Sequence, residues 1–211
     1  MLKILYSDHD IVVCVKPAGV LSQDAGEQSM PGLLRRQLSS ETFHVIHRLD
    51  REVGGVMVFA RTERAAAKLG KAVQERKLEK EYLAVLRGVP EMPEATLEDL
   101  LYHDKTKNKT YVVKRRRKGV RDAKLSYNVL KTEEQHALVH VRLYTGRTHQ
   151  IRVQFASRQL PLAGDGKYGG KEPGSSLGLW SFRLAFPHPI SEKWMEFEEK
   201  MPEAEPWKKF T

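Results

Sequence analysis

One stretch of this 211-residue chain, residues 47–61, limits the possible folds more than any other. It ends in the apolar run 56–60, whose β-branched and aromatic side chains predict a buried strand. A polar turn precedes that run, with Asp50 between Arg48 and Arg51. Because the backbone is fixed where a buried strand begins, the polar side chains of the turn can face a cleft. Taken alone, the turn also fits an Asp50 that only pairs with a neighbouring arginine on a solvated loop.

The charge balance indicates a polyanionic partner. The chain has 36 Lys and Arg residues against 27 Asp and Glu residues, a net charge of +9, within an ordinary composition of 40% hydrophobic and 30% charged residues. This excess favours nucleic acid or an anionic membrane surface as the partner. No apolar run approaches the roughly 20 residues that span a bilayer, and the first ten residues lack a signal-peptide pattern. We therefore expect a cytoplasmic protein without a membrane span, folded as a single domain over residues 1–211.

The single cysteine of the chain, Cys14, lies in the apolar run 11–15. It cannot form an internal disulfide, which agrees with a reducing compartment. We expect a small buried strand residue rather than a catalytic thiol.

Strand-like segments outnumber helical ones. Helices are expected from Ser29 to Leu38, from Thr62 to about Lys77, and over 148–159, and a glycine-rich loop over 163–178. No strand–helix–strand rhythm repeats, so the pattern favours an α+β fold on a largely antiparallel sheet. The expected strands are 2–6, 11–15, 43–46, 56–60, 80–87, 123–130, 137–143, 179–186 and 194–198.

Residues 90–121 are polar and strongly basic. Their spacing predicts a two-stranded ribbon that turns near Gly119, with basic side chains lying against a phosphate backbone and Tyr102 and Tyr111 between them. A solvated loop that touches nothing is the alternative. The candidate phosphate-binding residues are Arg115, Arg116, Arg117 and Lys118.

Two later stretches follow the HRLD sequence of residues 47–50: KEYLAVLRG at 80–88 and LYTGRTHQIR at 143–152. In this order, the three stretches resemble the RluA-type family of RNA pseudouridine synthases, and further matching segments extend the resemblance over nearly the whole chain. It implies the pseudouridine synthase fold, a largely antiparallel mixed sheet with flanking helices and a central catalytic cleft. The chain enters the catalytic pattern at once, so we expect no N-terminal RNA-binding domain of the S4 type. The further matching segments are 16–19, 164–169 and 179–189.

The chain departs from the usual family pattern in three places. Residues 53–55, Gln154 and residues 160–162 differ from what relatives commonly carry there. None of these differences replaces the residues to which the resemblance gives catalytic roles. Those residues are Asp50, Tyr82 and Arg147.

Isomerisation of uridine to pseudouridine breaks a C–N glycosidic bond and joins the rotated base to the same sugar carbon. No cofactor or metal is needed, and we expect neither. A carboxylate is needed, to attack the substrate or to stabilise a cationic sugar, and Asp50 is the candidate. By resemblance, Arg147 keeps that carboxylate ionised and oriented. The resemblance also implies that Tyr82 packs on the uracil and helps to move the proton from C5.

The partner implied by the resemblance is structured RNA, ribosomal or transfer, and no membrane partner is expected. The uridine must leave its stack, and Arg48 can enter the gap or hold the displaced strand. We expect His47, His149 and Arg152 to contact the RNA as well, the histidines through orienting hydrogen bonds. Asp165, within a glycine-rich turn, is expected to be structural. No protein partner is implied, which is compatible with a monomer.

Two other functions remain open at this point. A glycosidic hydrolase would use Asp50 with a second carboxylate such as Glu52, although Arg147 has no part in that scheme. A basic RNA-binding protein that keeps the fold without catalysis would not need the set Asp50, Tyr82 and Arg147. Isomerisation leaves the mass of the RNA unchanged, hydrolysis releases uracil, and a binding protein does neither.

Overall fold

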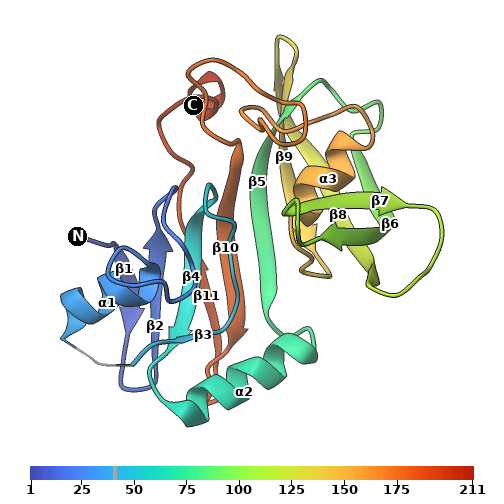
Figure 1. Cartoon of the computed structure of the whole chain (residues 1–211). Helices are drawn as coiled ribbons and strands as arrows, with labels where there is room; N and C mark the ends of the chain where they lie inside the picture. Colours follow the sequence, from blue (N-terminus) through green and yellow to red (C-terminus); the bar gives the residue numbers. More distant parts are fainter. Residues whose placement is uncertain (40–41) are drawn as a thin grey trace. The chain divides into compact units, whose positions relative to one another are not determined.

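The computed structural model describes residues 1–39 and 42–211, and the chain forms two compact units (Figure 1). The first unit comprises residues 1–80 and 180–200, and the second comprises residues 81–179 and 201–211. Each unit contains its own sheet strands and its own buried residues. That residues 1–211 behave as a single domain stays a prediction.

In the first unit the strands follow the order β1–β2–β4–β10, with β3 beside β4 and β11 beside β10. The pairs β1–β2, β2–β4, β3–β4 and β10–β11 are antiparallel, and β4–β10 is parallel. Each of these strands begins and ends within two residues of its predicted bounds. They are β1 (Ile4–Ser7), β2 (Ile11–Lys16), β3 (His44–Val45), β4 (Gly54–Ala60), β10 (Leu179–Pro187) and β11 (Trp194–Glu198).

The two helices of the first unit, α1 (Met30–Leu38) and α2 (Glu63–Gln74), begin at the predicted caps. Ser29 accepts a hydrogen bond from the backbone N–H of Gly32, and Thr62 accepts one from that of Ala65. These bonds satisfy amide groups that have no partner within the helix. No helix within residues 1–39 and 42–211 is long and apolar enough to cross a membrane.

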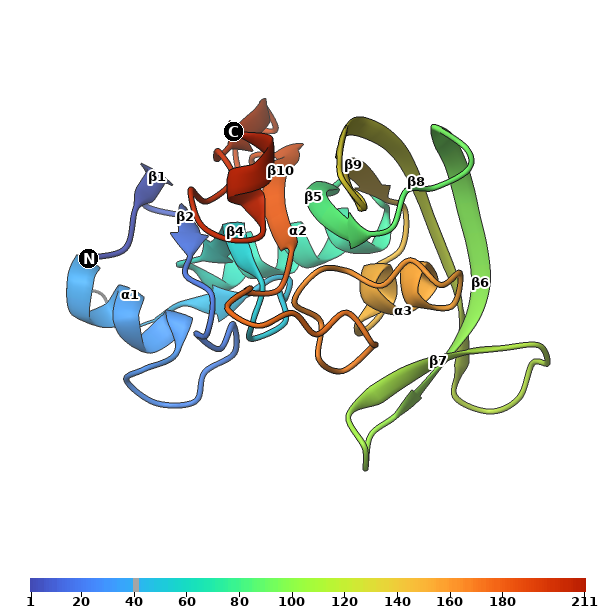
Figure 2. The same ribbon diagram turned by 90° about the horizontal axis from the view of Figure 1, so that it is seen from above.

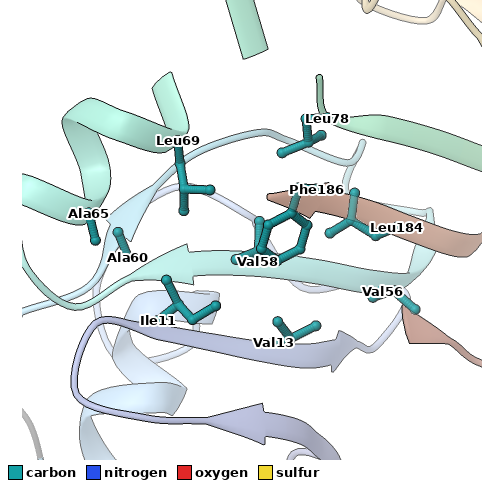
Figure 3. Close-up of a cluster of buried hydrophobic side chains, with 10 residues drawn as sticks. All are labelled: Ile11, Val13, Val56, Val58, Ala60, Ala65, Leu69, Leu78, Leu184 and Phe186. Carbon is teal, nitrogen blue, oxygen red and sulfur yellow. The ribbon is translucent and has the colours of Figure 1, made fainter. Parts of the chain in front are cut away.

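A cluster of buried aliphatic and aromatic side chains forms the core of the first unit (Figure 3). Val56 and Val58 of β4 lie in it together with Ile11 and Val13 of β2, and Leu69 of α2 packs against them. Alternate residues of each strand meet there, as the period of a pleated strand requires. Outside this cluster, the side chain of Cys14 is also buried, which confirms the expected buried strand cysteine, and burial raises the pKa of its thiol to about 12.

The second unit contains strands in the order β5–β9–β8–β6–β7. The pairs β6–β7, β6–β8 and β8–β9 are antiparallel. Helix α3 lies against β6 and β7 in both views, and Val153 packs on Leu101 and Ala123 (Figures 1 and 2). The elements are β5 (Glu79–Arg87), β6 (Glu94–Asp104), β7 (Lys109–Val113), β8 (Val120–Glu133), β9 (His136–Leu143), α3 (Gln150–Ala156) and the short 3₁₀ helix η1 (Trp207–Phe210).

The prediction of a ribbon that turns near Gly119 is wrong, because the strands pair differently. Strand β6 lies between β7 and β8, so the hairpin turn falls at residues 105–108 and residues 114–119 cross from β7 to β8. This crossing segment passes over Tyr102, since the Arg117 guanidinium lies 4.7 Å from the centre of the tyrosine ring. At Gly119, φ is +86° and a Cβ would lie 3.4 Å from that ring. A glycine there permits both the turn and the close approach.

Other boundaries also differ from the prediction, and β8, for example, extends three residues beyond the predicted 123–130 at each end. Helix α3 is shorter than the predicted 148–159, because His149 and Gln159 both adopt left-handed backbone conformations, with φ of 54° and 61°. Strand β4 begins two residues earlier than predicted, at Gly54, where it pairs with β10. Only a residue without a side chain fits at Gly54 and Gly55, the positions of β4 that pair with β10.

We expect Gly55→Ala to lower the free energy of unfolding by roughly 3 kcal/mol or more. Gly55 has φ of +119°, and a Cβ there would lie 2.2 Å from the carbonyl oxygen of Ser181. Gly70→Ala is the matched control, because Gly70 lies within α2 and a Cβ would meet nothing within 4 Å. It should raise stability by about 0.5–1 kcal/mol. Urea denaturation measures both, and equal effects of the two substitutions would contradict the packing argument.

Candidate active site

A buried lysine fixes the turn that carries Asp50. The side chain of Lys16 is 0% exposed, at the end of β2. Its ammonium donates hydrogen bonds to three backbone carbonyls, those of Pro17 at 2.9 Å, Arg51 at 3.0 Å and Val53 at 2.6 Å. An ammonium has three protons to donate, so this set uses its full capacity. The turn on the C-terminal side of Asp50 is therefore tied to the preceding strand of the sheet.

The charge of Lys16 is maintained despite its burial. Burial lowers the pKa of its side chain to about 8, while the nearby carboxylates of Asp50 and Glu52 act in the opposite direction. At pH 7 the group is mostly protonated. From the sequence, Lys16 is expected only in a turn, and this role is not predicted. A lysine within an apolar strand, just before a proline, was the available signal.

The N-terminal side of the Asp50 turn is tied as well. The hydroxyl of Ser22 donates to the carbonyl of Leu49 at 2.8 Å and accepts from the Leu49 N–H at 3.1 Å. The N–H of Gly19 donates to the carbonyl of Arg51, and the Nε of Arg51 donates back to the carbonyl of Gly19. The backbone on both sides of Asp50 is thus held by the segment 16–22.

The other two residues of the HRLD sequence have different surroundings. His47 is buried, and its Nε2 accepts the backbone N–H of Val58 at 3.2 Å. Burial, with a smaller contribution from Lys80, lowers the pKa of His47 to about 3, so the ring is neutral and serves as a backbone anchor. Arg48 is exposed, and its Nη1 donates to Oε1 of Gln23 at 3.1 Å.

Arg147 lies in the second unit, just before α3. Its Nε donates to the backbone carbonyl of Asp122 at 2.8 Å. Its backbone N–H donates to Oε1 of Gln150 at 3.0 Å, and the hydroxyl of Thr145 donates to the same oxygen at 2.8 Å. The side chain and backbone of Arg147 are thus both held.

Gln150 belongs to a buried chain of amide groups that the sequence analysis missed. Its Nε2 donates to Oε1 of Gln154 at 3.0 Å, and Nε2 of Gln154 donates to a carboxylate oxygen of Asp99 at 2.7 Å. Arg158 pairs with the same carboxylate. The signal was present, because two glutamines four residues apart share one face of a helix. Gln154, which departs from the family pattern, therefore helps to fix the start of α3.

Tyr82 is buried on β5 in the second unit, which also contains Arg147, whereas Asp50 lies in the first unit. The structure thus places Tyr82 and Arg147 in one compact unit. That all three side chains converge on a single cleft stays a prediction.

Arg152 and Asp165 form a buried ion pair. Nε and Nη2 of Arg152 donate to the two carboxylate oxygens of Asp165 at 2.7 and 2.8 Å. Asp165 also accepts the backbone N–H groups of Lys167 and Tyr168. Asp165 therefore has the expected structural role. The buried pairing does not favour RNA contact by Arg152, which stays a prediction.

The four basic residues 115–118 are exposed but are not equivalent. Arg116 forms a bidentate pair with Asp122 at 3.0 and 2.6 Å, and this pairing lowers the pKa of the aspartate. Arg117 covers Tyr102. Arg115 and Lys118 are therefore the residues of this segment best suited to contact phosphates.

Comparison with known proteins identifies the family. The model of the RNA pseudouridylate synthase family matches residues 10–157. An uncharacterised RNA pseudouridine synthase of Aquifex aeolicus is 34% identical over 96% of this chain and 70% of its own length. The ribosomal large subunit pseudouridine synthase D of Neisseria meningitidis (serogroup A) is also 34% identical, over 96% of this chain and 59% of its own length.

Solved structures agree with this result. Human RNA pseudouridylate synthase domain containing 4 has a TM-score of 0.78 and 26% identity, covering 95% of this chain and 88% of its own. Human RNA pseudouridylate synthase domain containing 1 has a TM-score of 0.82 and 24% identity, covering 96% and 84%. The chain belongs to the RluA-type family of RNA pseudouridine synthases, which are isomerases, and it has their α+β fold. Within the described residues, no cluster of three or more His, Cys, Asp or Glu side chains could hold a metal ion.

Replacing Lys16 by Met should reduce turnover of RNA at least tenfold, because the Asp50 turn would lose the two hydrogen bonds that it accepts from Lys16, and with them its fixed position. Lys68→Met, at an exposed position of α2, is the matched control and should leave turnover unchanged. Single-turnover rates at saturating RNA measure the effect, together with urea denaturation to verify folding. A folded Lys16→Met protein that turns over within twofold of the wild type would contradict the role of Lys16.

Proposed function

We propose that this chain converts a uridine of ribosomal RNA into pseudouridine, with Asp50 as the catalytic carboxylate. The observation that carries the choice of Asp50 is the set of backbone hydrogen bonds around it, from Lys16, Ser22 and Gly19. A reacting group must be held in one geometry, and here the backbone is held on both sides of one carboxylate.

The chemistry requires little besides positioned groups. Asp50 either attacks the substrate or stabilises a cationic sugar while the bond between N1 and the sugar carbon breaks. The freed base then rotates and C5 bonds to the same carbon, which breaks the bond to Asp50 where Asp50 has attacked. With the help of Tyr82 a base removes the proton from C5, and N1 takes up a proton in its place. Atoms and charge balance without any donor, oxidant or metal. Arg147 orients the carboxylate of Asp50 and favours its ionised form.

The uridine must leave its stack before its sugar carbon is accessible, which costs a few kcal/mol. Arg48 suits the gap that the base leaves, because it is exposed and its guanidinium is held by Gln23 next to the Asp50 turn. Within this proposal, His149 contacts the RNA close to Arg147.

Ribosomal RNA is the preferred substrate because of the relatives. Those from Neisseria meningitidis and Nitrosomonas europaea are described as ribosomal large subunit pseudouridine synthases. Transfer RNA is the alternative. Mapping of pseudouridine in cellular RNA with and without this protein distinguishes them, since the missing modification identifies both the RNA and the uridine.

We expect Asp50→Asn to abolish pseudouridine formation while RNA affinity stays within a few fold, because the lost charge acts on the reacting bond. Glu52→Gln is the matched control, since Glu52 is an exposed neighbouring carboxylate, and it should retain turnover. Mass spectrometry of the treated RNA measures pseudouridine and any released uracil. Substantial turnover by Asp50→Asn would exclude Asp50, and release of uracil that depends on Glu52 would support the hydrolase instead.

Replacing Arg115 and Lys118 together by Gln should weaken RNA binding and flatten its salt dependence. For each phosphate that the protein no longer neutralises, the slope of log affinity against log salt should fall by roughly 0.7 to 0.9, while turnover at saturating RNA changes little. Arg116→Gln should reduce the slope less, since Arg116 already pairs with Asp122. Lys68→Gln with Lys71→Gln, exposed on α2, is the control. Identical slopes for wild type and the Arg115/Lys118 variant would remove this segment from the RNA surface.

A further inference from the structure

Thr110 is a buried residue of β7 that joins three segments of the second unit. Its side chain is almost inaccessible, and its hydroxyl donates to the backbone carbonyl of Thr148 at 2.8 Å. Its backbone N–H donates to the hydroxyl of Tyr168 at 2.8 Å. Nδ1 of His103 lies 3.0 Å from the Thr110 hydroxyl. The β6–β7 hairpin, the turn before α3 and the loop after it therefore meet at one threonine.

The directions of these hydrogen bonds follow from the number of protons available. The Thr110 hydroxyl has one proton, which goes to the Thr148 carbonyl, so Nδ1 of His103 donates to the hydroxyl oxygen. The Tyr168 hydroxyl accepts from the Thr110 N–H and lies 2.9 Å from Nδ1 of His149, with which it forms a second hydrogen bond.

Tyr168 is itself held firmly. It follows the Asp165 turn, and both the Arg152 guanidinium and the Lys109 ammonium lie 5.3 Å from the centre of its ring. Burial raises the pKa of Tyr168, so its hydroxyl stays protonated.

The bonds from Thr110 and Tyr168 end on the strained part of the turn before α3. His149 has φ of 54°, a left-handed conformation that residues other than glycine seldom adopt. Thr110 holds the carbonyl directly before His149, and Tyr168 holds the imidazole of His149 itself. Such a conformation persists only where surrounding contacts determine it. Arg147 lies two residues before this point in the same turn, and its carbonyl accepts the backbone N–H of Gln150.

We propose that Thr110 and Tyr168 are positioning residues for Arg147. Their hydroxyls lock the β6–β7 hairpin onto the turn 147–149, so that Arg147 is held at a fixed spacing from the basic segment 115–118 that follows the hairpin. This inference rests on the proposed function, in which Arg147 assists the reaction and the basic segment contacts phosphates. The fixed spacing then determines which uridine, counted from the bound phosphates, reaches Arg147.

Substitutions that remove single hydroxyls test the proposal. Thr110→Val keeps the shape of the side chain, Thr110→Ser keeps the hydroxyl, and Tyr168→Phe keeps the ring. Thr132→Val is the matched control, because it removes a hydroxyl from an exposed position of β8. For each protein we would measure the single-turnover rate at saturating RNA, the dissociation constant of the RNA and the hydrogen exchange of the amides of residues 150–153.

Thr110→Val and Tyr168→Phe should lower the rate about ten- to a hundredfold, the effect of misplacing a reacting group. The dissociation constant should change less than about threefold, since the phosphate-binding side chains remain. Thr110→Ser should recover the rate to within about threefold of the wild type, and amide exchange at residues 150–153 should accelerate only in the two impaired variants. Thr132→Val should match the wild type in all three measurements.

A wild-type rate in Thr110→Val would overturn the proposal, and so would a loss that Thr110→Ser does not recover, because volume rather than the hydroxyl would then matter. If Thr110→Val does not fold, Tyr168→Phe decides by the same criteria. A wild-type protein that makes no pseudouridine would refute the proposed function instead. In that case unchanged amide exchange in the two variants would still refute the lock, and faster exchange would support it.

Discussion

The charge of Lys16, enclosed at the end of β2, is the interaction on which the candidate site depends most. Burying an ammonium costs several kcal/mol unless hydrogen bonds replace its water, and here three carbonyls do so. Two of those carbonyls, of Arg51 and Val53, belong to the Asp50 turn. The ammonium therefore converts a polar loop into a fixed extension of the sheet. It also places a positive charge near the carboxylate that we propose as catalytic.

In the second unit, neutral groups hold Arg147 in place. Gln150 and Gln154 connect the backbone of Arg147 to Asp99, and the carbonyl of Asp122 holds its side chain. Buried amides stabilise a structure only when every donor and acceptor is satisfied, so the linked side chains of Gln150 and Gln154 tolerate few substitutions. In both units the contacts hold backbone as well as side chains. Residues remote from the chemistry thereby control where the functional groups lie.

This arrangement suits an isomerase of the RNA pseudouridine synthase family. The reaction neither gains nor loses atoms, so catalysis depends on holding the base and the sugar in the right orientation, together with the carboxylate of Asp50 in the proposed mechanism. Two left-handed backbone conformations, those of His149 before α3 and of Gly55 in β4, lie at buried positions where neighbouring groups determine them. The net charge of +9 provides the attraction to RNA. Hydrogen bonds from single residues such as Lys16 and Gln150 fix the geometry of the candidate site.

The sequence by itself determined what depends on neighbouring residues. The buried strand at 56–60, the caps Ser29 and Thr62, and the family motifs are local patterns, and the structure and the comparisons confirm them. Tertiary structure decided what depends on residues far apart in the chain. It placed β6 between β7 and β8, started β4 at a glycine opposite β10, and gave Arg116 and Arg152 acidic partners. Hydrophobic period and capping act over one or two turns, whereas strand partners and buried ion pairs are selected only when the whole chain packs.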